Sequence, residues 1–431
     1  MKSRKGARLT RALRHRNFRL FFGGQSISLV GSWITRVATS WLIYRLTGSE
    51  LLLGIAGFCG QIPTLLVTPF AGVLVDRMDR RRILVATQVA SLVQSAALAV
   101  LTLGGHITVV QIVLLQVVQG VINAFDTPAR QAFVSEMVED RRDLPNAIAL
   151  NSSMVNGSRI IGPSIGGLLI AGVGEGWCFA IDAASYLGVI ASLLAMRIEP
   201  RLRSGAAEMR ILEELRHGWG YILGSVPIRT ALLLVAIISV AGTPYTVLMP
   251  AIATQTLGGG PNTLGLLMAA TGVGALTGAL YLASRESVLG LGRVIVVATF
   301  MFGGGLIGFS QTTSLPLACV LLAVAGGGFM MQLAAANTFL QTIVEEALRG
   351  RVMSFYTMAF FGTVPIGSLL GGAIAERAGA ASTVALSGVV CLIAGVWFGL
   401  RLPAIRKLVR PVYRELGILT VPAVDAGTKT L

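Results

Sequence analysis

The chain has 431 residues, of which 54% are hydrophobic and only 13% are charged, and its mean hydropathy is +0.75. A soluble domain carries about a quarter charged residues, so this composition argues against a water-soluble multi-domain enzyme. The formal net charge of +15 does not indicate a nucleic-acid-binding protein, because the basic residues lie in short stretches between long apolar runs.

The cysteines and histidines indicate neither a metal site nor a redox pair. Cys59, Cys178, Cys319 and Cys391 lie in or beside apolar runs, no two of them form a CxxC, and the three histidines are scattered. The sequence has no GxxxxGK[ST] phosphate-binding loop, so ATP is not the expected energy source. No nucleophile, base and oxyanion group cluster at readable spacing, so we expect no enzymatic activity, no cofactor and no metal.

The chain begins with a basic arm, residues 1–17, followed by an apolar stretch that continues to about Leu46. A basic leader before an apolar run is also the pattern of a signal peptide. This run is too long for a signal-peptide core, and no small-residue cleavage site stands out. We therefore expect a retained first membrane helix and a cytoplasmic arm that lies on anionic lipid.

Apolar runs recur along the rest of the chain, and each is long enough to cross a ~30 Å hydrocarbon core as a helix. The sequence predicts an all-α membrane protein with twelve transmembrane helices, in an N-terminal six-helix bundle (18–196) and a C-terminal six-helix bundle (228–401). The expected spans are 18–46, 51–75, 83–103, 107–133, 146–172, 176–196, 228–255, 263–284, 291–310, 315–341, 352–376 and 380–400.

A polar segment, 197–227, is expected to be a cytoplasmic linker between the bundles, and 402–431 a cytoplasmic tail. The tail is too short for a soluble signalling domain. Apolar residues recur in the linker at helical spacing and predict a short amphipathic helix at the lipid interface. These residues are Met209, Leu212, Leu215 and Trp219.

The placement of basic residues predicts the orientation of the chain in the membrane. With the N-terminus in the cytoplasm, an even number of spans puts the C-terminus there too. Nearly all arginine-rich loops then fall on the cytoplasmic side, and only Arg45 and Arg377 fall near the outer ends. The positive-inside rule therefore predicts a multi-pass protein of the inner (plasma) membrane with both termini cytoplasmic.

The two halves of the sequence resemble each other. "SLVGSW" near residue 28 is similar to "SVAGTP" near 239, and "RIIGPSIGGLL" in the fifth expected helix is similar to "VPIGSLLGGAI" in the eleventh. Gly120 in "VVQGVINAF" and Gly326 in "AVAGGGFMM" also correspond. A repeat of six plus six helices is typical of transporters, because two similar bundles can rock about a central site.

Residues 72–82, "GVLVDRMDRRR", form a basic loop between the second and third expected spans, and here the chain resembles the major facilitator superfamily. That superfamily has Gly-x-x-x-Asp-Arg-x-Gly-Arg-Arg in this loop. The matching residues are Gly72, Asp76, Arg77, Arg80 and Arg81, and Asp79 stands where the pattern has its second Gly.

The resemblance implies that this loop is a cytoplasmic latch. Asp76 would cap or pair with a neighbouring helix end, and the arginines would bind across the two halves when the inner gate closes. A generic positive-inside loop explains the arginines, but it does not explain Gly72 and Asp76 at this spacing.

The fifth expected helix contains "NGSRIIGPSIGG", which resembles the antiporter motif of exporters in this superfamily. A proline removes one helix hydrogen bond, and glycines let a neighbouring helix approach closely. The motif favours export over import, although ordinary small-residue packing is the alternative. Its residues are Gly157, Gly162, Pro163, Gly166 and Gly167.

Within the superfamily, the chain is most similar to the branch of the enterobactin exporter, macrolide efflux proteins and transmembrane secretion effectors. "LRHRNFRLFFGGQSISLVGSW", "WLIYRLTGSELLLG" and "FAIDAASYLG" carry this resemblance, mainly in the N-terminal half. The arginine common in the fourth helix of superfamily exporters is absent, and Gln116 and Gln119 occupy that region.

Charged residues at membrane depth are costly, so each is a candidate substrate or proton site. Arg36 in the first span and Asp182 in the sixth lie at similar depth, so they could pair or bracket a polar cavity. A fixed ion pair between helices is the structural alternative. Asp126 and Arg130 are four residues apart in the fourth span and could simply neutralise each other, or Asp126 could be a proton or substrate site.

Polar residues also recur on single faces of the fifth and tenth expected helices. Ser152, Asn156, Arg159 and Pro163 form one stripe, which is too polar to face lipid, so Asn156 and Arg159 are candidates for the cavity wall. The repeat places Gln332 opposite Asp126, and Asn337 and Gln341 follow it. A cationic Arg159 would suit an anionic or polyphenolic substrate.

The sequence therefore predicts a monomeric secondary transporter that exports a small amphipathic molecule, of drug or siderophore type, by alternating access. Its expected partners are this small-molecule substrate, protons as the coupling ion and the lipid bilayer, with no nucleic acid. A uniporter or importer of the same fold, and a non-transporting membrane sensor or scaffold, are the alternatives.

Overall fold

The computed structural model describes residues 11–197, 219–285, 287–416 and 418, without the side chains of Val73, Asp76 and Ala347. Most of the expected basic arm, the expected amphipathic helix of the linker except Trp219, and the end of the expected tail lie outside these residues. The Asp76 side chain of the expected latch also lies outside them.

The residues described are almost entirely helical. The first set of long helices comprises Arg16–Thr47 (α2), Glu50–Arg77 (α3), Arg80–Leu103 (α4), Val109–Phe133 (α5), Leu144–Val173 (α6) and Glu175–Ala195 (α7). The second set comprises Val226–Gly242 (α9), Pro244–Ala251 (α10), Pro261–Ala283 (α11), Leu291–Gln311 (α12), Leu315–Ile343 (α13), Glu346–Phe361 (α14), Val364–Ala378 (α15) and Ala380–Glu415 (α16).

Ten helical segments of the described chain are long and apolar enough to cross a membrane. α2 and α6 are not among them, although they have 32 and 30 residues. Both are rich in Gly, Ser and other polar residues, and each carries one arginine near its middle, Arg36 and Arg159. These two helices are long enough to cross a membrane but less apolar than the other ten segments. A helix of this polarity cannot be surrounded by lipid on all sides, so part of its surface must face other helices or a cavity.

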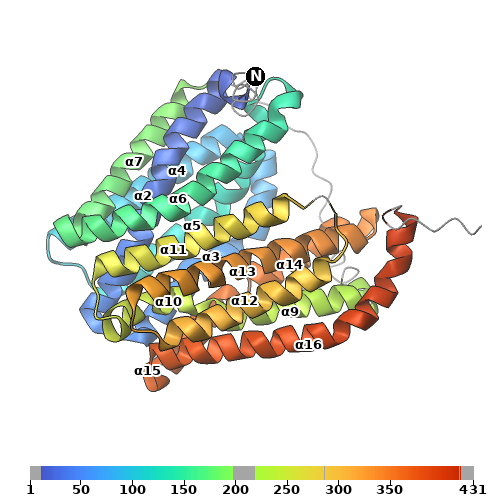
Figure 1. The fold of residues 1–431 in the computed structure, drawn as a ribbon. Helices are drawn as coiled ribbons and strands as arrows, with labels where there is room; N and C mark the ends of the chain where they lie inside the picture. The colour runs from blue at the N-terminus through green and yellow to red at the C-terminus, as the bar shows by residue number, and fades with distance from the viewer. Residues whose placement is uncertain (1–10, 198–218, 286, 417, 419–431) are drawn as a thin grey trace, which may run out of the picture.

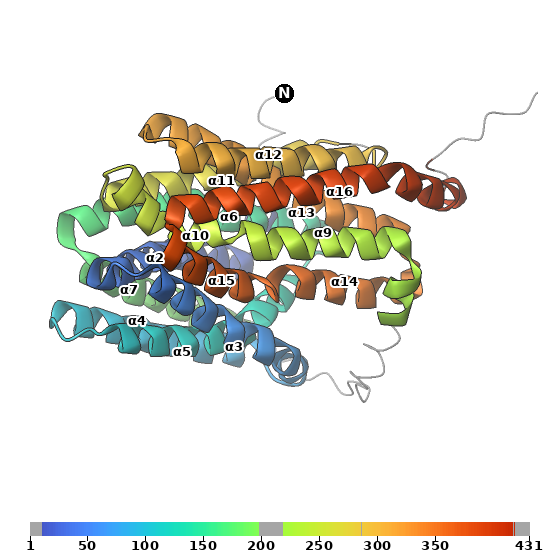
Figure 2. The same cartoon turned by 90° about the horizontal axis from the view of Figure 1, so that it is seen from below.

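Each set of helices packs mainly on itself (Figures 1 and 2). In the first set α7 lies against α2 and α4, and α5 lies against α3 and α4. In the second set α13 lies against α11 and α12, and α16 lies against α9 and α12. The two sets meet chiefly along two helix pairs, α6 with α11 and α3 with α15.

Two of the expected spans are interrupted in the structure. The expected span 228–255 is divided into α9, α10 and a π-helical turn, Ile252–Thr256, and the break precedes Pro244. The expected span 352–376 is divided into α14 and α15, with Pro365 in the first turn of α15. Proline lacks the N–H that would continue the helix, so both breaks follow from the residue type.

The last helix is longer than expected. The sequence predicts a span that ends at residue 400 and a tail from 402, but α16 continues to Glu415. Its 36 residues correspond to about 54 Å of helix, which exceeds a ~30 Å hydrocarbon core. Since the final turns carry several arginines, we expect them to lie beyond the core.

Candidate functional site

The two ends of the helical bundle differ in composition and packing. The arginine-rich end carries Arg80 at the start of α4 and Arg410 near the end of α16. The opposite end carries Glu50, where α3 begins, and Glu376 in the last turns of α15. Figure 1 shows the two sets meeting at one end and diverging toward the other.

Glycines bring the two sets together at the opposite end. A Cβ on Gly372 of α15 would lie 2.8 Å from the Gly54 Cα of α3, and a Cβ on Gly265 of α11 would lie 3.0 Å from the Gly167 Cα of α6. Any larger side chain would push these backbones apart, so the absence of a Cβ is what permits both crossings.

Polar contacts also join the two sets at this end. The Gln255 Nε2 donates to the Tyr44 hydroxyl at 2.7 Å and to the Glu50 Oε1 at 2.9 Å. The Glu376 Oε2 accepts hydrogen bonds of 2.9 Å from the Ser49 hydroxyl and from the Leu51 backbone N–H. Glu376 of the second set thus caps the first turn of α3, where the helix dipole favours a carboxylate.

The faces of α3 and α6 that contact the second set at the opposite end are uncovered toward the arginine-rich end. Gly54, Gly57 and Leu65 of α3 contact the second set. Gly72 follows on that face at helical spacing, yet a Cβ on it would meet nothing within 4 Å among the described atoms. On α6, Ile160 is in contact with Gly272 of α11, while Ser152 and Ser153 beyond it are exposed. The inter-set faces therefore separate about halfway along these helices.

Two arginines share one tryptophan where the sets begin to separate. The Arg36 Cζ lies 4.5 Å from the Trp33 ring centroid, and the Arg159 Cζ lies 5.7 Å from it. Arg36 comes from α2 and Arg159 from α6. Cation–π contact stabilises a guanidinium at such distances.

Both guanidinium groups lack an acidic partner within the described part of the chain. No ion pair there includes Arg36 or Arg159, and the buried Arg159 Nε has no hydrogen-bond partner. Arg36 is exposed although it lies mid-helix. Two unneutralised cations beside an aromatic ring have the chemistry to bind an anionic group and an aromatic ring together.

Asp182 does not pair with Arg36. Its Oδ2 accepts hydrogen bonds from the Thr35 hydroxyl at 2.8 Å and from the Ser95 hydroxyl at 2.9 Å, and its Oδ1 has no partner among the described atoms. Only 2% of the residue is exposed. Gly31 allows this approach, because a Cβ there would lie 2.7 Å from Oδ1. Of the arrangements that the sequence left open for these two residues, the structure contains no ion pair, because Thr35 contacts Asp182 whereas Arg36, the next residue of α2, lies over Trp33.

Asp126 is neutralised inside the first set. The Arg130 Nε lies 3.4 Å from its Oδ2, while the Thr87 hydroxyl and the Gln88 amide donate to its Oδ1 at 3.1 and 2.8 Å. Of the two alternatives left open by the sequence, the structure contains the mutual pairing of Asp126 and Arg130. Asp126 therefore has a cationic partner, whereas the donors to Asp182 are neutral hydroxyl groups.

The expected amide residues lie in different environments. The Asn156 Nδ2 donates to the Ser152 carbonyl at 2.9 Å, on the uncovered part of α6. Asn337 accepts a hydrogen bond from Gln341 on α13. Gln332 is fully buried, and neither its Nε2 nor its Oε1 has a partner among the described atoms. The structure does not bring these three residues to the Arg36–Arg159 site by any described contact.

Arg80 and Arg81 of the 72–82 loop bind partners within the first set. The Arg80 Nη1 lies 2.7 Å from the Glu136 Oε1, and Arg81 donates to the backbone carbonyls of Leu193 and Leu194 at 2.8 and 2.9 Å. Asp79 caps α4 by accepting from the Arg81 N–H at 2.9 Å. The residue that replaces the second Gly of the pattern thus has a local role in starting α4.

A neighbouring loop at the same end makes further local polar contacts through Asp140 and Asp143. Asp143 contacts Arg11 at 2.9 Å and His15 at 3.1 Å. Asp140 caps the short turn Arg141–Asp143, and its hydrogen bonds with Arg142 lower the pKa of that carboxyl. These contacts hold the arginine-rich end of the first set together without reaching the second set.

Glycines of the helix-five motif contact both sets. Gly162 and Gly166 face Trp33 and Ile34 of α2, and Gly167 faces α11. Gly157 has open space at its Cβ position within the described structure. The motif thus places α6 between α2 of its own set and α11 of the other set. A change in the angle between the two sets would alter the packing of α6 against α11.

Sequence reasoning did not identify Trp33, Gln255 or Glu376 as site residues. Trp33 precedes Arg36 by three residues, so helical spacing could have indicated the stacking. Gln255 and Glu376 carry no such signal, because their partners are more than 200 residues away in the chain. The described residues also contain no group of three or more metal-ligating side chains.

The sequence matches the transmembrane secretion effector family over residues 10–411. The staphyloferrin A transporter of Staphylococcus aureus is 26% identical, over 88% of this chain and 95% of its own. The multidrug efflux pump Tap of Mycolicibacterium fortuitum is 28% identical, over 88% and 93%. Macrolide efflux protein A of Streptococcus pyogenes is 26% identical, over 87% and 94%.

Solved transporter structures share the fold at low sequence identity. A nucleoside transporter superposes with a TM-score of 0.70 at 12% identity, covering 91% of this chain and 99% of that one. A bacterial homologue of the lysosomal transporter Spinster, in an inward-facing conformation, has a TM-score of 0.65 at 16% identity, covering 95% and 99%. Together with the family match over most of its length, these likenesses establish that the chain belongs to the transmembrane secretion effector family of major facilitator transporters.

Proposed function

We propose that this protein exports a small, anionic, amphipathic molecule across the plasma membrane by alternating access. The observation that carries the proposal is the pair of guanidinium groups of Arg36 and Arg159, which both lie over the Trp33 ring. Uncompensated charge at membrane depth is costly and is retained at substrate pathways. An anionic group would bind the arginines, and an aromatic or apolar part would lie on Trp33.

The named activities of the relatives agree with export of a small molecule. One relative is named for transport of the siderophore staphyloferrin A, and others for drug or macrolide efflux. A site of two arginines and a tryptophan favours the siderophore type over a cationic drug, because like charges repel in a low-dielectric cavity.

Proton antiport is the proposed energy source, with Asp182 as the carrier. Asp182 is buried and receives only neutral hydroxyl donors, whereas Asp126 is offset by Arg130. A buried carboxylate without a cation is costly, so the group gains most from holding a proton. Thr35, which binds Asp182, directly precedes Arg36, so α2 links the proposed proton and substrate sites.

The proposed membrane arrangement has twelve spans in two six-helix bundles, with the domain limits expected from the sequence. α2 and α6 complete the count, and α9–α10 and α14–α15 each act as one broken span. The arginine-rich end would face the cytoplasm, together with both termini. The Gly72–Arg81 loop would act as the latch when this end closes, since the Gly72 face is open in the present conformation.

The proposal can be tested in proteoliposomes with an imposed pH gradient reported by a fluorescent dye. Candidate siderophores and macrolides are added in turn. Substrate-dependent collapse of the gradient would establish antiport. Substrate movement without proton movement would instead establish a uniporter or importer of the same fold, and no movement of any anionic compound would contradict the assigned substrate class.

A further inference from the structure

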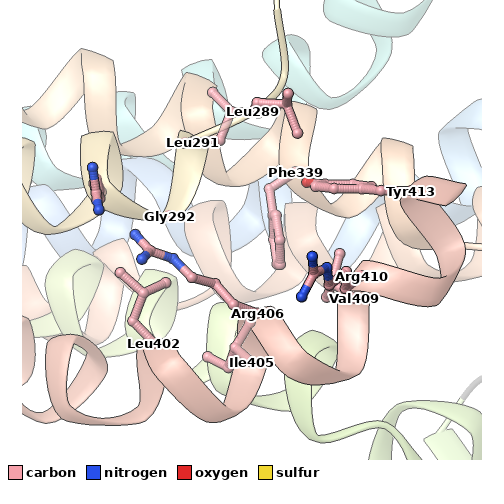
Figure 3. A pocket seen from close by; sticks show the side chains of 12 residues that line it. Leu289, Leu291, Gly292, Phe339, Leu402, Ile405, Arg406, Val409, Arg410 and Tyr413 are labelled. Carbon is pink, nitrogen blue, oxygen red and sulfur yellow. The ribbon is translucent and has the colours of Figure 1, made fainter. Parts of the chain in front are cut away.

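A cavity of about 430 Å³ lies at the arginine-rich end of the second set, apart from the candidate transport site (Figure 3). It is bounded by the turn before α12, by Phe339 of α13 and by the final turns of α16. This volume lies within the usual range of small-molecule binding pockets, about 300–1,000 Å³. None of its lining residues belongs to the Arg36–Arg159 site.

The walls of this cavity divide into an apolar floor and a cationic rim. Apolar side chains from three helices form the floor and are almost fully buried. They are Leu291, Phe339, Leu402, Ile405 and Val409. The rim carries three exposed arginines, Arg293 at the start of α12 and Arg406 and Arg410 one turn apart on α16. In Figure 3 the guanidinium groups of Arg406 and Arg410 are seen on either side of the Phe339 ring.

The rim arginines have no acidic partner in the described chain. No ion pair among those residues includes Arg293, Arg406 or Arg410, and no acidic residue is among those that line the cavity. The arginines at the start of α4 differ, because Arg80 binds Glu136 and Arg81 binds two backbone carbonyls. The second set therefore presents a cationic cluster that is available to an external anion.

The position of the cavity along α16 places it at the membrane surface. About 20 residues of helix span the ~30 Å hydrocarbon core, so a helix that enters at Ala380 leaves the core near residue 400. The lining residues Leu402 to Tyr413 follow directly after that point. Lipid phosphates occupy this level, with their acyl chains toward the core.

We propose that this cavity binds an anionic phospholipid. The phosphate would accept hydrogen bonds from the three arginines, and the first part of an acyl chain would cover the apolar floor. Guanidinium groups bind phosphate strongly and in a fork-like geometry. A free phosphate would satisfy the rim but would leave the exposed apolar wall of the cavity, at Leu289, uncovered, so the geometry favours the lipid. Basic cavities between membrane helices bind anionic headgroups by this chemistry.

The test uses the full-length protein in detergent and counts retained lipids by native mass spectrometry, with phosphatidylglycerol and phosphatidylcholine compared. The pocket variant is Arg406→Gln/Arg410→Gln. The matched control is Arg401→Gln/Arg414→Gln, which removes the same charge from α16 at residues that do not line the cavity. We expect the pocket variant to bind phosphatidylglycerol at least about tenfold more weakly, and the control to bind it as the native protein does.

Three outcomes would overturn the proposal: equal loss in both double variants, equal binding of phosphatidylcholine, or full competition by inorganic phosphate at millimolar concentration. The first would indicate a general basic surface and the last a free-anion site. A second pocket variant, which keeps both arginines, tests the site independently in case the double arginine variant folds poorly. Leu289→Glu places an acid in the half-exposed wall, where it would occupy the arginines, and should weaken phosphatidylglycerol binding as well.

Discussion

Individual charged residues at membrane depth differ in how well their charge is compensated. Asp126 has Arg130 and two neutral donors. Arg36, Arg159 and Asp182 have no such partner among the described residues. Since uncompensated charge destabilises a helix bundle, these three residues are the ones whose retention requires a functional reason.

Substituting Arg159 by Gln should weaken binding of an anionic substrate. A hydrogen bond to a charged group contributes about 1.5–3 kcal/mol, so KM for efflux should rise roughly tenfold to a hundredfold. Uptake of an anionic aromatic dye into inside-out vesicles measures this. Arg401→Gln is the matched control, because Arg401 stacks over Trp397 at 5.1 Å outside the transport site. An equal effect in both variants would remove Arg159 from the substrate site.

Replacement of Asp182 by Asn should uncouple transport from protons. The amide can still accept from Thr35 and Ser95 but cannot carry a proton, so downhill substrate flux should persist while substrate-driven proton movement is lost. Both quantities are measured in the same proteoliposomes. Asp126→Asn is the comparison. If it alone abolishes proton movement, Asp126 is the carrier and Asp182 has a structural role.

The two helix sets are in contact at one end of the molecule because two pairs of helices cross there. At the opposite end, α3 crosses α15 and α6 crosses α11 through glycines, and Glu376 and Gln255 add hydrogen bonds across the two sets. The breaks at Pro244 and Pro365 lie in the segments that contribute α10 and α15 to this contact. Interrupted helices can change angle locally, so these breaks are suited to a hinge.

A bulky residue at Gly372 should open the opposite end. The Cβ alone would meet the Glu50 carbonyl at 2.7 Å, so Gly372→Leu must separate α3 from α15, and overpacking of this kind costs about 1–3 kcal/mol. Spin labels at Leu46 and Arg377 should report a longer distance than in the native protein. Gly172→Leu is the control, because its Cβ position is open in the described structure. An unchanged distance would contradict this role of the glycine crossing.

At the scale of the whole molecule, the structure is a conformation closed at the opposite end and open at the arginine-rich end. Gly72 and Gly157 have open space in it, although the adjacent parts of their helices are packed across the sets. If the molecule rocks about the Arg36–Arg159 level, those faces become buried in the alternate state. Rocking of two similar helix sets about a central site is sufficient for alternating access.

Closure of the arginine-rich end should depend on the 72–82 loop. Labels at the exposed residues Arg82 and Arg349, on the two sets, should show a second, shorter distance when substrate and a proton gradient are present. Asp76→Asn should fold normally but lose most of this shorter population, with reduced efflux. Native efflux and an unchanged distance distribution in Asp76→Asn would contradict the latch.

Much of the architecture was predictable from sequence, because membrane helices must satisfy their hydrogen bonds locally and bury apolar surface at a known length. Composition and periodicity therefore predicted the helical membrane fold and the candidate residues Arg36, Arg159 and Asp182, while the resemblance of the 72–82 loop and the helix-five motif to known transporters predicted the family. The partners of these residues depend on which helix faces meet. Only the tertiary structure assigned Asp182 to Thr35 and Ser95 instead of Arg36, and Trp33 to both arginines. Contacts between residues far apart in the chain carry no local pattern, so only the fold decides them.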